Sequence, residues 1–525
     1  MTRSSASADA LGADPSIPSL DAMVRRAFRD HAGMTAISKA GRVQSYAELF
    51  ETACGLAGLF AECVADGEAV GILAQRSFIA YAAVLGAVLA GRPWVPLNMK
   101  FPFERQLAMA KIARCALLVS DRKSAARHRQ LDSELGLAGA MITEEALPPP
   151  ARSGAPEPTA APQDEELAYV MFTSGTTGLP KGVAARRSNL AAYLRAIEQV
   201  APLPAGSRCT QLFDLSFDLS VHDLFRTWMA GGALWIMEDE EMLDPVGFAC
   251  RNELECWFSV PSVVAMAQRL DRLNAGALPA LRLSLFCGEA LPLAIAEAWA
   301  RAAPNSRILN LYGPTEATIA ITACEFRRRI PASNLPVSVP LGAAFRGSAA
   351  VAMSDAGAPV AQGGSGELWL GGDQITAGYL NNPQETERKF VARSIEGFSW
   401  RRWYRTGDLV QRDPVHGLVF EGRLDDQIKL QGYRVELLEI EAALRAASGA
   451  SEVAAVPWPI SPTGAAEGIV GFVCGARSTE REIISDCRKR LASYMVPRRI
   501  SFVDQIPLNA NGKVDRKALV RLLDL

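Results

Sequence analysis

A run of glycines and hydroxyl-bearing residues follows a short apolar stretch. Residues 169–182 read Tyr-Val-Met-Phe-Thr-Ser-Gly-Thr-Thr-Gly-Leu-Pro-Lys-Gly, and the four leading residues predict a short buried strand. Backbone N–H groups and hydroxyls spaced this closely can surround a polyphosphate, and a lysine adds a point charge. A surface turn of the same composition is the alternative, and the Walker loop spacing is absent. The predicted phosphate-binding residues are Thr173, Ser174, Gly175, Thr176, Thr177, Gly178 and Lys181.

Two later segments carry residue types suited to a nucleotide. Residues 310–320, Asn-Leu-Tyr-Gly-Pro-Thr-Glu-Ala-Thr-Ile-Ala, predict a strand that runs into a Gly-Pro turn. Such a turn can present Tyr312 as a flat surface for adenine, while Glu316 supplies an oxygen ligand for a Mg²⁺ that keeps most of its waters. In residues 404–408, Tyr-Arg-Thr-Gly-Asp, the carboxylate of Asp408 can accept from both hydroxyls of a ribose.

Three aspartates stand in an otherwise apolar segment, residues 213–225, Phe-Asp-Leu-Ser-Phe-Asp-Leu-Ser-Val-His-Asp-Leu-Phe. A carboxylate there needs a partner, because burying it bare costs several kcal/mol. We expect Asp214 and Asp223 to be helix caps or turn formers. From the residues alone, Asp218 fits either that role or a pairing with a ligand.

The elements around these motifs alternate between strand and helix. Ser45 and Glu48 form a capping box that opens a helix. Strands are expected at 69–74, 94–97 and 116–120, and helices at 78–90 and 103–113. This βα alternation predicts a parallel sheet covered by helices. The tail predicts a small α+β domain, with helices at 437–446 and 480–491 and strands at 453–458, 468–474 and 500–503.

Length and composition exclude several functional classes. A chain of 525 residues predicts two to four domains at about 150 residues each. The net charge of −2, with acids and bases interspersed, argues against nucleic acid or an anionic membrane as partner. Ten cysteines without a C-x-x-C pair argue against a zinc site and a secreted disulfide framework, so we expect a cytoplasmic protein. Residues 1–19 predict a disordered leader, and the longest apolar run, 78–91, is too short for membrane insertion.

The motifs together resemble those of one superfamily. Residues 169–182, 310–320, 404–408, 422–436 and 508–516 stand in the order found in the adenylate-forming enzymes, which include amino-acid adenylation domains, acyl-CoA synthetases and luciferases. The resemblance implies an α/β fold, with a large N-terminal domain over residues 20–424 and a small mobile α+β C-terminal domain over residues 425–525. The large domain is expected to contain two α/β subdomains and a β-rich one. The implied reaction uses ATP and Mg²⁺ to convert a carboxylate to an acyl-AMP, which is then transferred to a thiol.

The resemblance also assigns roles to individual residues. Arg423 meets the ribose or the α-phosphate, Thr315 lies at the ATP site, and Asp425 is the hinge between the domains. Asp218 falls where amino-acid adenylation domains pair an aspartate with the substrate's α-ammonium. Lys513, beside an Asn-Gly turn, is the family's catalytic lysine and stabilises charge on the carboxylate and α-phosphate. The catalytic residues implied are Lys513, Glu316 and Arg423, with Glu316 as the metal ligand.

Alignment of the motifs predicts the pocket for the substrate side chain. Its wall is apolar apart from one histidine and one cysteine, which disfavours charged and amide side chains. A bulky phenylalanine in the wall favours a small free amino acid, in the order alanine, proline, then glycine, serine or cysteine. The predicted substrate-binding residues are Asp218, Leu219, His222, Phe258, Leu285, Cys287, Gly288, Leu311, Ile319 and Ala320.

The thiol is expected to arrive on a separate molecule. The sequence contains neither an H-H-x-x-x-D-G condensation signature nor a phosphopantetheine-attachment serine in an L-G-G-x-S setting. The chain therefore resembles stand-alone adenylation domains of nonribosomal peptide synthesis and the D-alanine carrier protein ligases, whose acceptor is a phosphopantetheinylated carrier protein in trans. Three alternatives remain: an acyl-CoA synthetase, which generally lacks the aspartate at position 218; a luciferase-like oxygenase; and a binding protein, in which we expect Lys513, Glu316 or Asp408 to be lost.

The predicted domain rotation can be tested at Lys513. We expect Lys513→Ala to abolish adenylation but to leave thiol transfer from supplied aminoacyl-AMP largely intact. The reason is that the resemblance to the adenylate-forming enzymes implies a rotation about Asp425 that exchanges the lysine turn for the face that carries Gly432. ATP–pyrophosphate exchange measures the first step and single-turnover thioester formation the second. Near-wild-type exchange in the variant contradicts the assignment.

Overall fold

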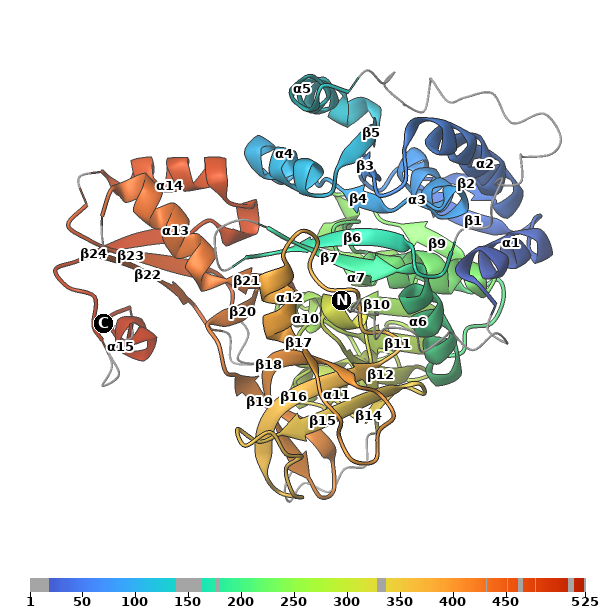
Figure 1. Ribbon diagram of the computed structural model, residues 1–525. Coiled ribbons are helices and arrows are strands. Elements are labelled where there is room, and N and C mark those ends of the chain that lie inside the picture. The colour runs from blue at the N-terminus through green and yellow to red at the C-terminus, as the bar shows by residue number, and fades with distance from the viewer. Residues whose placement is uncertain are drawn as a thin grey trace, which may run out of the picture.

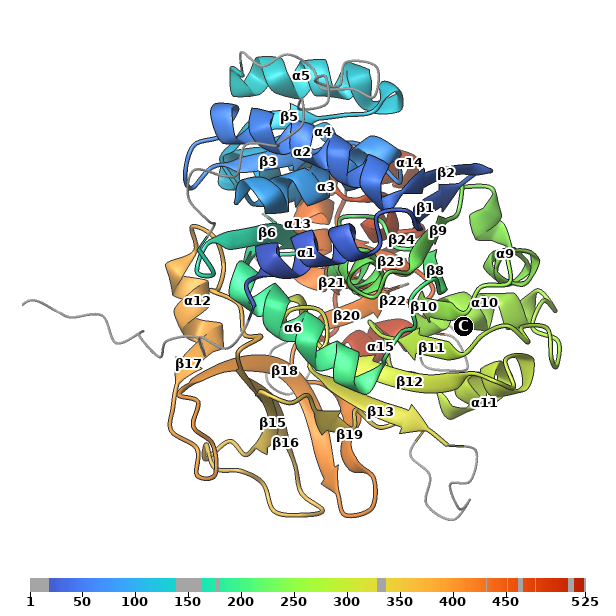
Figure 2. The same cartoon turned by 90° about the vertical axis from the view of Figure 1, so that its right-hand side faces the viewer.

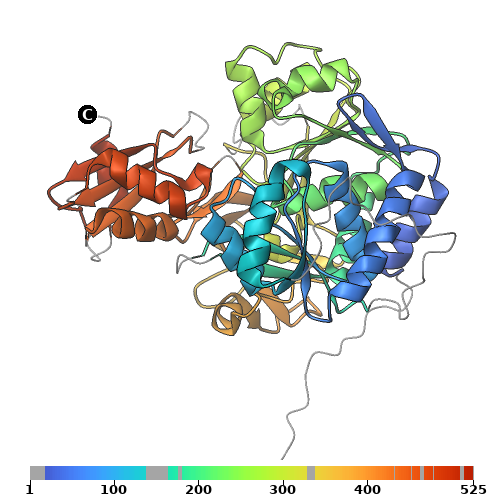
Figure 3. The same cartoon turned by 90° about the horizontal axis from the view of Figure 1, so that it is seen from above.

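A computed structural model describes residues 18–137, 163–175, 180–327, 337–430, 432–450, 452–460, 466–476, 478–508 and 514–523. Three sheets and their helices form the large body of the molecule (Figure 1). The elements from β20 onward form a smaller part at one side of that body (Figure 3). This arrangement of a large N-terminal and a small C-terminal part, with an α/β fold, confirms the expected fold class.

The first sheet contains the predicted βα alternation. It has the order β5-β3-β4-β6-β7, and its first four strands are parallel. Each predicted element in this region is confirmed to within two residues. The strands are β3 (Ala69–Ile72), β4 (Trp94–Pro96), β5 (Cys115–Val119), β6 (Leu167–Thr173) and β7 (Lys181–Arg186). The helices are α1 (Leu20–Asp30), α2 (Tyr46–Cys63), α3 (Phe78–Ala90), α4 (Phe103–Ile112), α5 (Ala125–Leu135) and α6 (Arg187–Val200).

The second sheet has nine strands among the described residues, in the order β14-β13-β12-β11-β10-β8-β9-β1-β2. Figure 2 shows α10 and α11 beside β10, β11 and β12, against which their apolar residues pack. The strands are β1 (Thr35–Lys39), β2 (Arg42–Ser45), β8 (Arg208–Gln211), β9 (Ala233–Ile236), β10 (Cys256–Ser259), β11 (Leu283–Phe286), β12 (Arg307–Tyr312), β13 (Thr322–Phe326) and β14 (Ala343–Ala344). The helices are α7 (Asp218–Val221), α8 (Thr227–Met229), α9 (Pro245–Arg251), α10 (Pro261–Arg269) and α11 (Leu293–Ala302).

The third sheet is antiparallel and forms the β-rich part of the body. Its order is β15-β16-β18-β17, with β19 paired to β18. The register of that last pair sets Asp408 opposite Arg423, which brings two predicted nucleotide residues together. The elements are β15 (Ser348–Met353), β16 (Ser365–Gly372), β17 (Phe390–Ala392), β18 (Arg402–Asp413), β19 (Gly417–Arg423) and the helix α12 (Pro383–Lys389).

The C-terminal part begins with a two-stranded hairpin, β20 (Gln427–Leu430) and β21 (Tyr433–Glu436). The hairpin contacts the body, and Arg105 of α4 forms a buried ion pair with Glu439 of α13. One apolar cluster, which includes Leu107 and Ile440, also spans both parts. The remaining elements are α13 (Leu437–Ser448), β22 (Glu452–Pro457), β23 (Ile469–Cys474), α14 (Glu480–Arg490), β24 (Arg499–Val503) and α15 (Arg516–Arg521).

Helices α2 and α3 pack closely because Gly86 lacks a side chain. The predicted capping box opens α2, with Ser45 and Glu48 each bonded to the other's backbone N–H. Nearly every residue of α3 is buried, which explains its unbroken apolar sequence. A Cβ on Gly86 would lie 2.9 Å from the carbonyl oxygen of Ala53. The helices therefore approach each other more closely at this point than an alanine allows.

The same substitution on these two helices should have opposite effects on stability. Gly86→Ala should lower the free energy of unfolding by about 1 to 3 kcal/mol, because backbone must shift to admit the methyl group. Gly58→Ala on α2 is the matched control, since a Cβ there meets nothing within 4 Å. It should raise the free energy of unfolding by about 0.4 to 1 kcal/mol. Urea unfolding of both variants measures the difference, and equal effects contradict the packing argument.

Candidate active site

Several predicted motifs meet around one cavity of about 70 Å³. The body contributes the end of β6, the start of α7, and the turns after β11 and β12, while the C-terminal part contributes the β20–β21 hairpin. The residues that line the cavity include Thr173, Ser174, Asp218, Gly288, Thr315, Lys429, Gly432 and Arg434. The sequence motifs identified the members from the body, but gave no role to Lys429 or Arg434.

The start of the phosphate loop contacts the C-terminal part directly. The hydroxyl of Ser174 donates to the carbonyl oxygen of Arg434 at 2.9 Å and accepts from the N–H of Glu436 at 3.1 Å. The N–H of Gly175 donates to a carboxylate oxygen of Glu439 at 3.2 Å. Residues 176–178 of the predicted loop lie outside the described residues. The donors at the start of the loop are therefore engaged by protein groups in this orientation.

Lys181 begins β7 and is paired with a carboxylate that the motifs did not reveal. Its Nζ lies 2.8 Å from Oε1 of Glu385, on α12, and both side chains are largely buried. Burial raises the pKa of Glu385, but hydrogen bonds from Arg388 and Lys181 outweigh it and lower that pKa to about 2. Glu385 lies in the first turn of α12, after the cap Asn382 and Pro383, a local pattern that indicates a helix start and no chemistry. The role of Lys181 toward phosphate stays a prediction.

Asp218 opens α7, and its buried side chain faces the cavity. Burial raises the pKa of Asp218 to about 6, although a hydrogen bond with the Thr315 side chain acts in the opposite direction. Among the described residues, no lysine or arginine forms an ion pair with it, although the charge of Lys429, which lines the same cavity, also lowers its pKa. A carboxylate held in this way is mostly ionised at neutral pH and is poised to gain from a cationic ligand.

Of the other two aspartates of this segment, Asp214 forms a turn, as expected, because its carbonyl oxygen accepts from the N–H of Phe217 at 2.9 Å. Asp223 neither caps a helix nor forms a turn, so the expectation is wrong for Asp223. Asp214 is buried and pairs with Arg76 at 3.1 Å and Lys100 at 2.9 Å, which outweigh burial and lower its pKa. Asp223 lies within a π-helical turn over His222–Arg226, and burial raises its pKa well above the usual range. Tertiary partners and burial, which the local pattern does not reveal, decide both cases.

The predicted side-chain pocket is tightly filled. The hydroxyl of Tyr193, on α6, lies 2.5 Å from Nδ1 of His222, and the His222 ring lies 4.5 Å from the ring of Phe258. Burial lowers the pKa of His222 to about 3, so its ring is neutral. Behind these rings there is a cavity of only about 10 Å³, about the space of one water. The other predicted wall residues are buried as well: Leu219, Leu285, Cys287, Leu311, Ile319 and Ala320.

The predicted nucleotide residues form one continuous chain of contacts. The Tyr312 hydroxyl donates to Asp408 at 2.5 Å, and Asp408 forms an ion pair with Arg423. Arg423 also binds both carboxylate oxygens of Asp425, at 2.7 and 2.8 Å. The predicted adenine, ribose and hinge residues are thus brought together from three separate segments. Their roles toward a nucleotide stay predictions.

Glu316 is buried and accepts from two side chains. Tyr379 donates its hydroxyl at 2.6 Å, and Arg434 donates Nη1 at 2.7 Å. Burial raises the pKa of Glu316, but Arg434 and Tyr379 outweigh it and lower that pKa to about 2. The described residues contain no cluster of three or more His, Cys, Asp or Glu side chains that could hold a metal. A lone buried carboxylate fits a Mg²⁺ whose remaining ligands are water and phosphate oxygens.

The orientation of the C-terminal part places Gly432 at the cavity. Gly432 has φ +83°, and a Cβ there would lie 2.6 Å from Cγ1 of Val260. Only glycine fits this turn without a shift of its neighbour. Lys513 lies outside the described residues, and α15, which begins at Arg516, lies on the far side of the C-terminal part from the body (Figure 1). The hairpin and not α15 faces the site.

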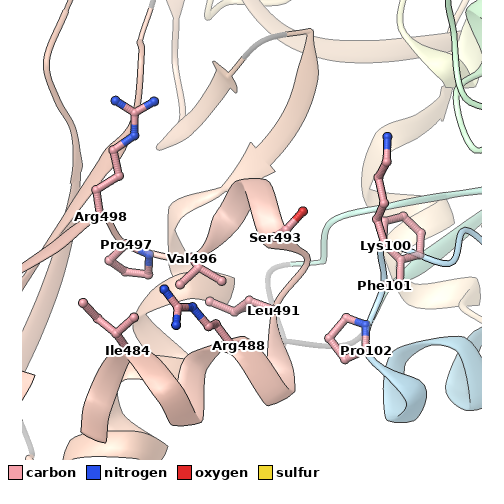
Figure 4. Close-up of a pocket in the computed structure, with 10 residues that line it drawn as sticks. All are labelled: Lys100, Phe101, Pro102, Ile484, Arg488, Leu491, Ser493, Val496, Pro497 and Arg498. Carbon is pink, nitrogen blue, oxygen red and sulfur yellow. The ribbon is translucent and has the colours of Figure 1, made fainter. Parts of the chain in front are cut away.

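A larger cleft of about 490 Å³ opens between the two parts (Figure 4). Lys100, Phe101 and Pro102 line one side, and α14 with residues 491–498 lines the other. Phe101 lines both this cleft and the smaller cavity. Arg488 and Arg498 lie on the C-terminal side of the cleft.

Comparison with known proteins identifies the class. The family described as AMP-binding enzyme matches residues 24–380, and the family described as AMP-binding enzyme C-terminal domain matches residues 439–513. The chain therefore belongs to the AMP-binding enzymes, as the motif order implied. Ligases of this family use ATP, and this chain is a ligase.

Its relatives include a carrier protein ligase, a peptide synthetase and an adenylation domain. The D-alanine–D-alanyl carrier protein ligase of Bacillus cytotoxicus is 33% identical over 83% of this chain and 86% of its own length. The phosphinothricin tripeptide synthetase PhsC of Streptomyces viridochromogenes is 34% identical over 95% of this chain, which spans 45% of that synthetase. The structure of the Vibrio cholerae adenylation domain AlmE with glycyl-adenosine-5'-phosphate is 31% identical, with a TM-score of 0.87 over 98% of this chain and 99% of that one.

None of the helices in the described part of the chain is long and apolar enough to cross a membrane.

The pKa of Asp218 predicts how amino-acid activation depends on pH. An α-ammonium pairs only with the carboxylate, so kcat/KM for the amino acid should be level above pH 7. It should fall about tenfold per pH unit well below pH 6, as Asp218 takes up a proton. Asp218→Asn should lose this acid limb and lower kcat/KM by about a hundredfold or more at pH 7.5. Pyrophosphate exchange from pH 5 to pH 8 measures both, and an acid limb retained in Asp218→Asn contradicts the assignment.

Proposed function

We propose that the chain activates a small neutral amino acid with ATP and Mg²⁺, releases pyrophosphate, and transfers the aminoacyl group to the phosphopantetheine thiol of a separate carrier protein. One observation carries the proposal. Asp218 and the phosphate-loop residues Thr173 and Ser174 line the same cavity, so an acceptor for an ammonium and donors for a phosphate face one space. The carrier protein ligases and synthetases among the relatives support the same reaction.

The buried carboxylate favours an amino acid over a simple carboxylic acid. Asp218 lacks an ion-pair partner among the described residues, and it is mostly ionised near neutral pH. A fatty or aryl acid would leave this charge facing an apolar group, which costs several kcal/mol. An α-ammonium instead supplies the missing cation. An acyl-CoA synthetase is therefore the weaker candidate.

The filled pocket favours the smallest side chains. His222 is fixed by Tyr193 and packs against Phe258, with a cavity of only about 10 Å³ behind the rings. Glycine needs no space there and alanine needs a methyl group, whereas a proline ring requires the rings to move. We therefore place glycine beside alanine and ahead of proline. The glycyl adenylate bound to the AlmE adenylation domain and the D-alanine named in the ligases support the same two candidates.

The proposed first step is a displacement at phosphorus. A carboxylate oxygen of the amino acid forms a bond to the α-phosphorus, and the bond from that phosphorus to pyrophosphate breaks. Mg²⁺ at Glu316 would neutralise phosphate charge when bound. Asp218 holds the ammonium, Asp408 the ribose, and Arg423 and Lys513 lower the energy of charge that develops at the α-phosphate. The chain contributes positioning and charge, with no covalent intermediate on the protein.

In the second step the carrier's thiol sulfur attacks the acyl carbon, the thiol gives up its proton, and AMP leaves. The cleft of about 490 Å³ is the proposed approach for the pantetheine arm, because Phe101 lines both the cleft and the smaller cavity. Arg488 and Arg498 lie beside that approach and suit the phosphate of the arm. Gly432 lets the hairpin lie close to Val260 beside the cavity.

Pyrophosphate exchange with every proteinogenic amino acid and with D-alanine tests this proposal. Wild-type protein should respond to glycine and alanine, and Phe258→Ala should admit valine or leucine by removing part of the wall. Two amino acids that differ by one methylene should differ by about 1 to 3 kcal/mol in transition-state binding, or by about tenfold to more than a hundredfold in kcat/KM.

Phe286→Ala is the matched control for this substitution. Phe286 is equally buried, but it follows Leu285 on β11 and packs on Trp299 in a different apolar cluster. Its truncation should lower stability and leave the order of substrates unchanged. Wild-type preference for phenylalanine, lysine or glutamate contradicts the pocket assignment, and exchange with a fatty acid alone restores the acyl-CoA synthetase reading.

A further inference from the structure

The carboxylate proposed to hold magnesium is occupied by a side chain of the C-terminal part. Arg434, on β21, donates to Oε2 of Glu316 at 2.7 Å, and the second oxygen accepts from Tyr379. Glu316 is 1% exposed. The two donors do not use all the lone pairs of a carboxylate, but a guanidinium and a Mg²⁺ in contact with the same buried oxygens repel each other. The ion pair therefore uses the position that a metal needs.

The arginine is held in place by its own hairpin. Its Nε donates to Oε1 of Gln427 at 2.6 Å, and the amide nitrogen of Gln427 donates to Glu436 at 2.5 Å. Gln427 and Glu436 are direct partners in the β20–β21 register. The guanidinium thus reaches Glu316 as part of a braced unit, which moves only when the whole hairpin moves.

We propose that Arg434 and magnesium occupy Glu316 in turn, so that the hairpin can seat only after the metal has left with pyrophosphate. The inference rests on the proposed function and adds a positioning residue to it. When Mg²⁺ leaves Glu316, Arg434 takes over as its cationic partner. The buried carboxylate is therefore paired with a positive charge in both orientations of the C-terminal part. The exchange makes departure of the first product a condition for the orientation seen here.

Pyrophosphate can also compete with the C-terminal part for the phosphate loop, and the experiment must separate this competition from the one at Glu316. Ser174 and Gly175 also bond to the C-terminal part, so pyrophosphate alone can displace the hairpin by competing for these donors. Competition at Glu316 requires the metal, whereas competition at the loop requires only the anion. Metal-free pyrophosphate and its magnesium complex therefore separate the two explanations.

Amide hydrogen exchange of the full chain measures seating of the hairpin without any turnover. The peptide that covers residues 427–436 is followed in ligand-free protein, with pyrophosphate and EDTA, and with pyrophosphate and Mg²⁺. Wild type should exchange at least about tenfold faster with the magnesium complex, and clearly less so with metal-free pyrophosphate. Arg434→Ala should already exchange about tenfold faster without ligand, and the magnesium complex should then add little.

Two further variants keep the result interpretable. Arg434→Lys keeps the charge but loses the fork geometry, so its exchange rate should lie between those of wild type and Arg434→Ala. Arg405→Ala is the matched control, because it removes another arginine–glutamate pair, at 2.9 Å from Glu367 in the β-rich sheet. It should leave the hairpin as protected as in wild type.

Each contrary result overturns the inference. Competition at Glu316 is excluded if the magnesium complex leaves hydrogen exchange of the wild-type hairpin unchanged, or if metal-free pyrophosphate speeds that exchange equally. It is also excluded if the hairpin of Arg434→Ala exchanges as slowly as that of the wild type. Failure of the proposed function is seen separately, as absence of pyrophosphate exchange with any amino acid. The pyrophosphate concentration that half-saturates ATP–pyrophosphate exchange sets the concentration used in the ligand-bound hydrogen-exchange samples.

Discussion

Buried carboxylates need cations, and this requirement organises the molecule around its site. Glu316 is matched by Arg434, Asp408 by Arg423, and Glu439 by Arg105. In the first and third of these pairs, the partners come from the body and from the C-terminal part. Because a buried charge without a partner costs several kcal/mol, each pair fixes where its two elements meet. The orientation of the C-terminal part depends on these contacts as much as on apolar burial.

Asp218 and Asp223 show the two outcomes for a buried acid without an ion-pair partner among the described residues. Burial raises the pKa of Asp223 well above the usual range, which favours the uncharged form of this core residue. The pKa of Asp218 rises only to about 6, so it carries charge near neutral pH while it lines a cavity. The difference in environment makes Asp223 a structural residue and leaves Asp218 able to bind a cationic ligand.

Local patterns predicted the elements and most of the site's members. The capping box at Ser45, the βα alternation and the tail elements all appear close to their expected bounds, because caps and apolar periodicity act over a few residues. The motifs also named residues that the fold brings together, such as Tyr312, Asp408 and Arg423. The partners Tyr193 and Glu385 were missed, since each lies in a helix whose sequence shows only amphipathic or capping features.

The sequence by itself determined the superfamily, the order of motifs and the residue types available for phosphate, ribose and ammonium. These follow from short segments whose spacing is fixed along the chain. Only the tertiary structure decided that His222 and Phe258 fill the side-chain pocket, that Asp214 pairs with Arg76, and that Arg434 occupies Glu316. Each of these depends on which distant side chains share a buried space, and burial sets both the size of a pocket and the cost of an unpaired charge.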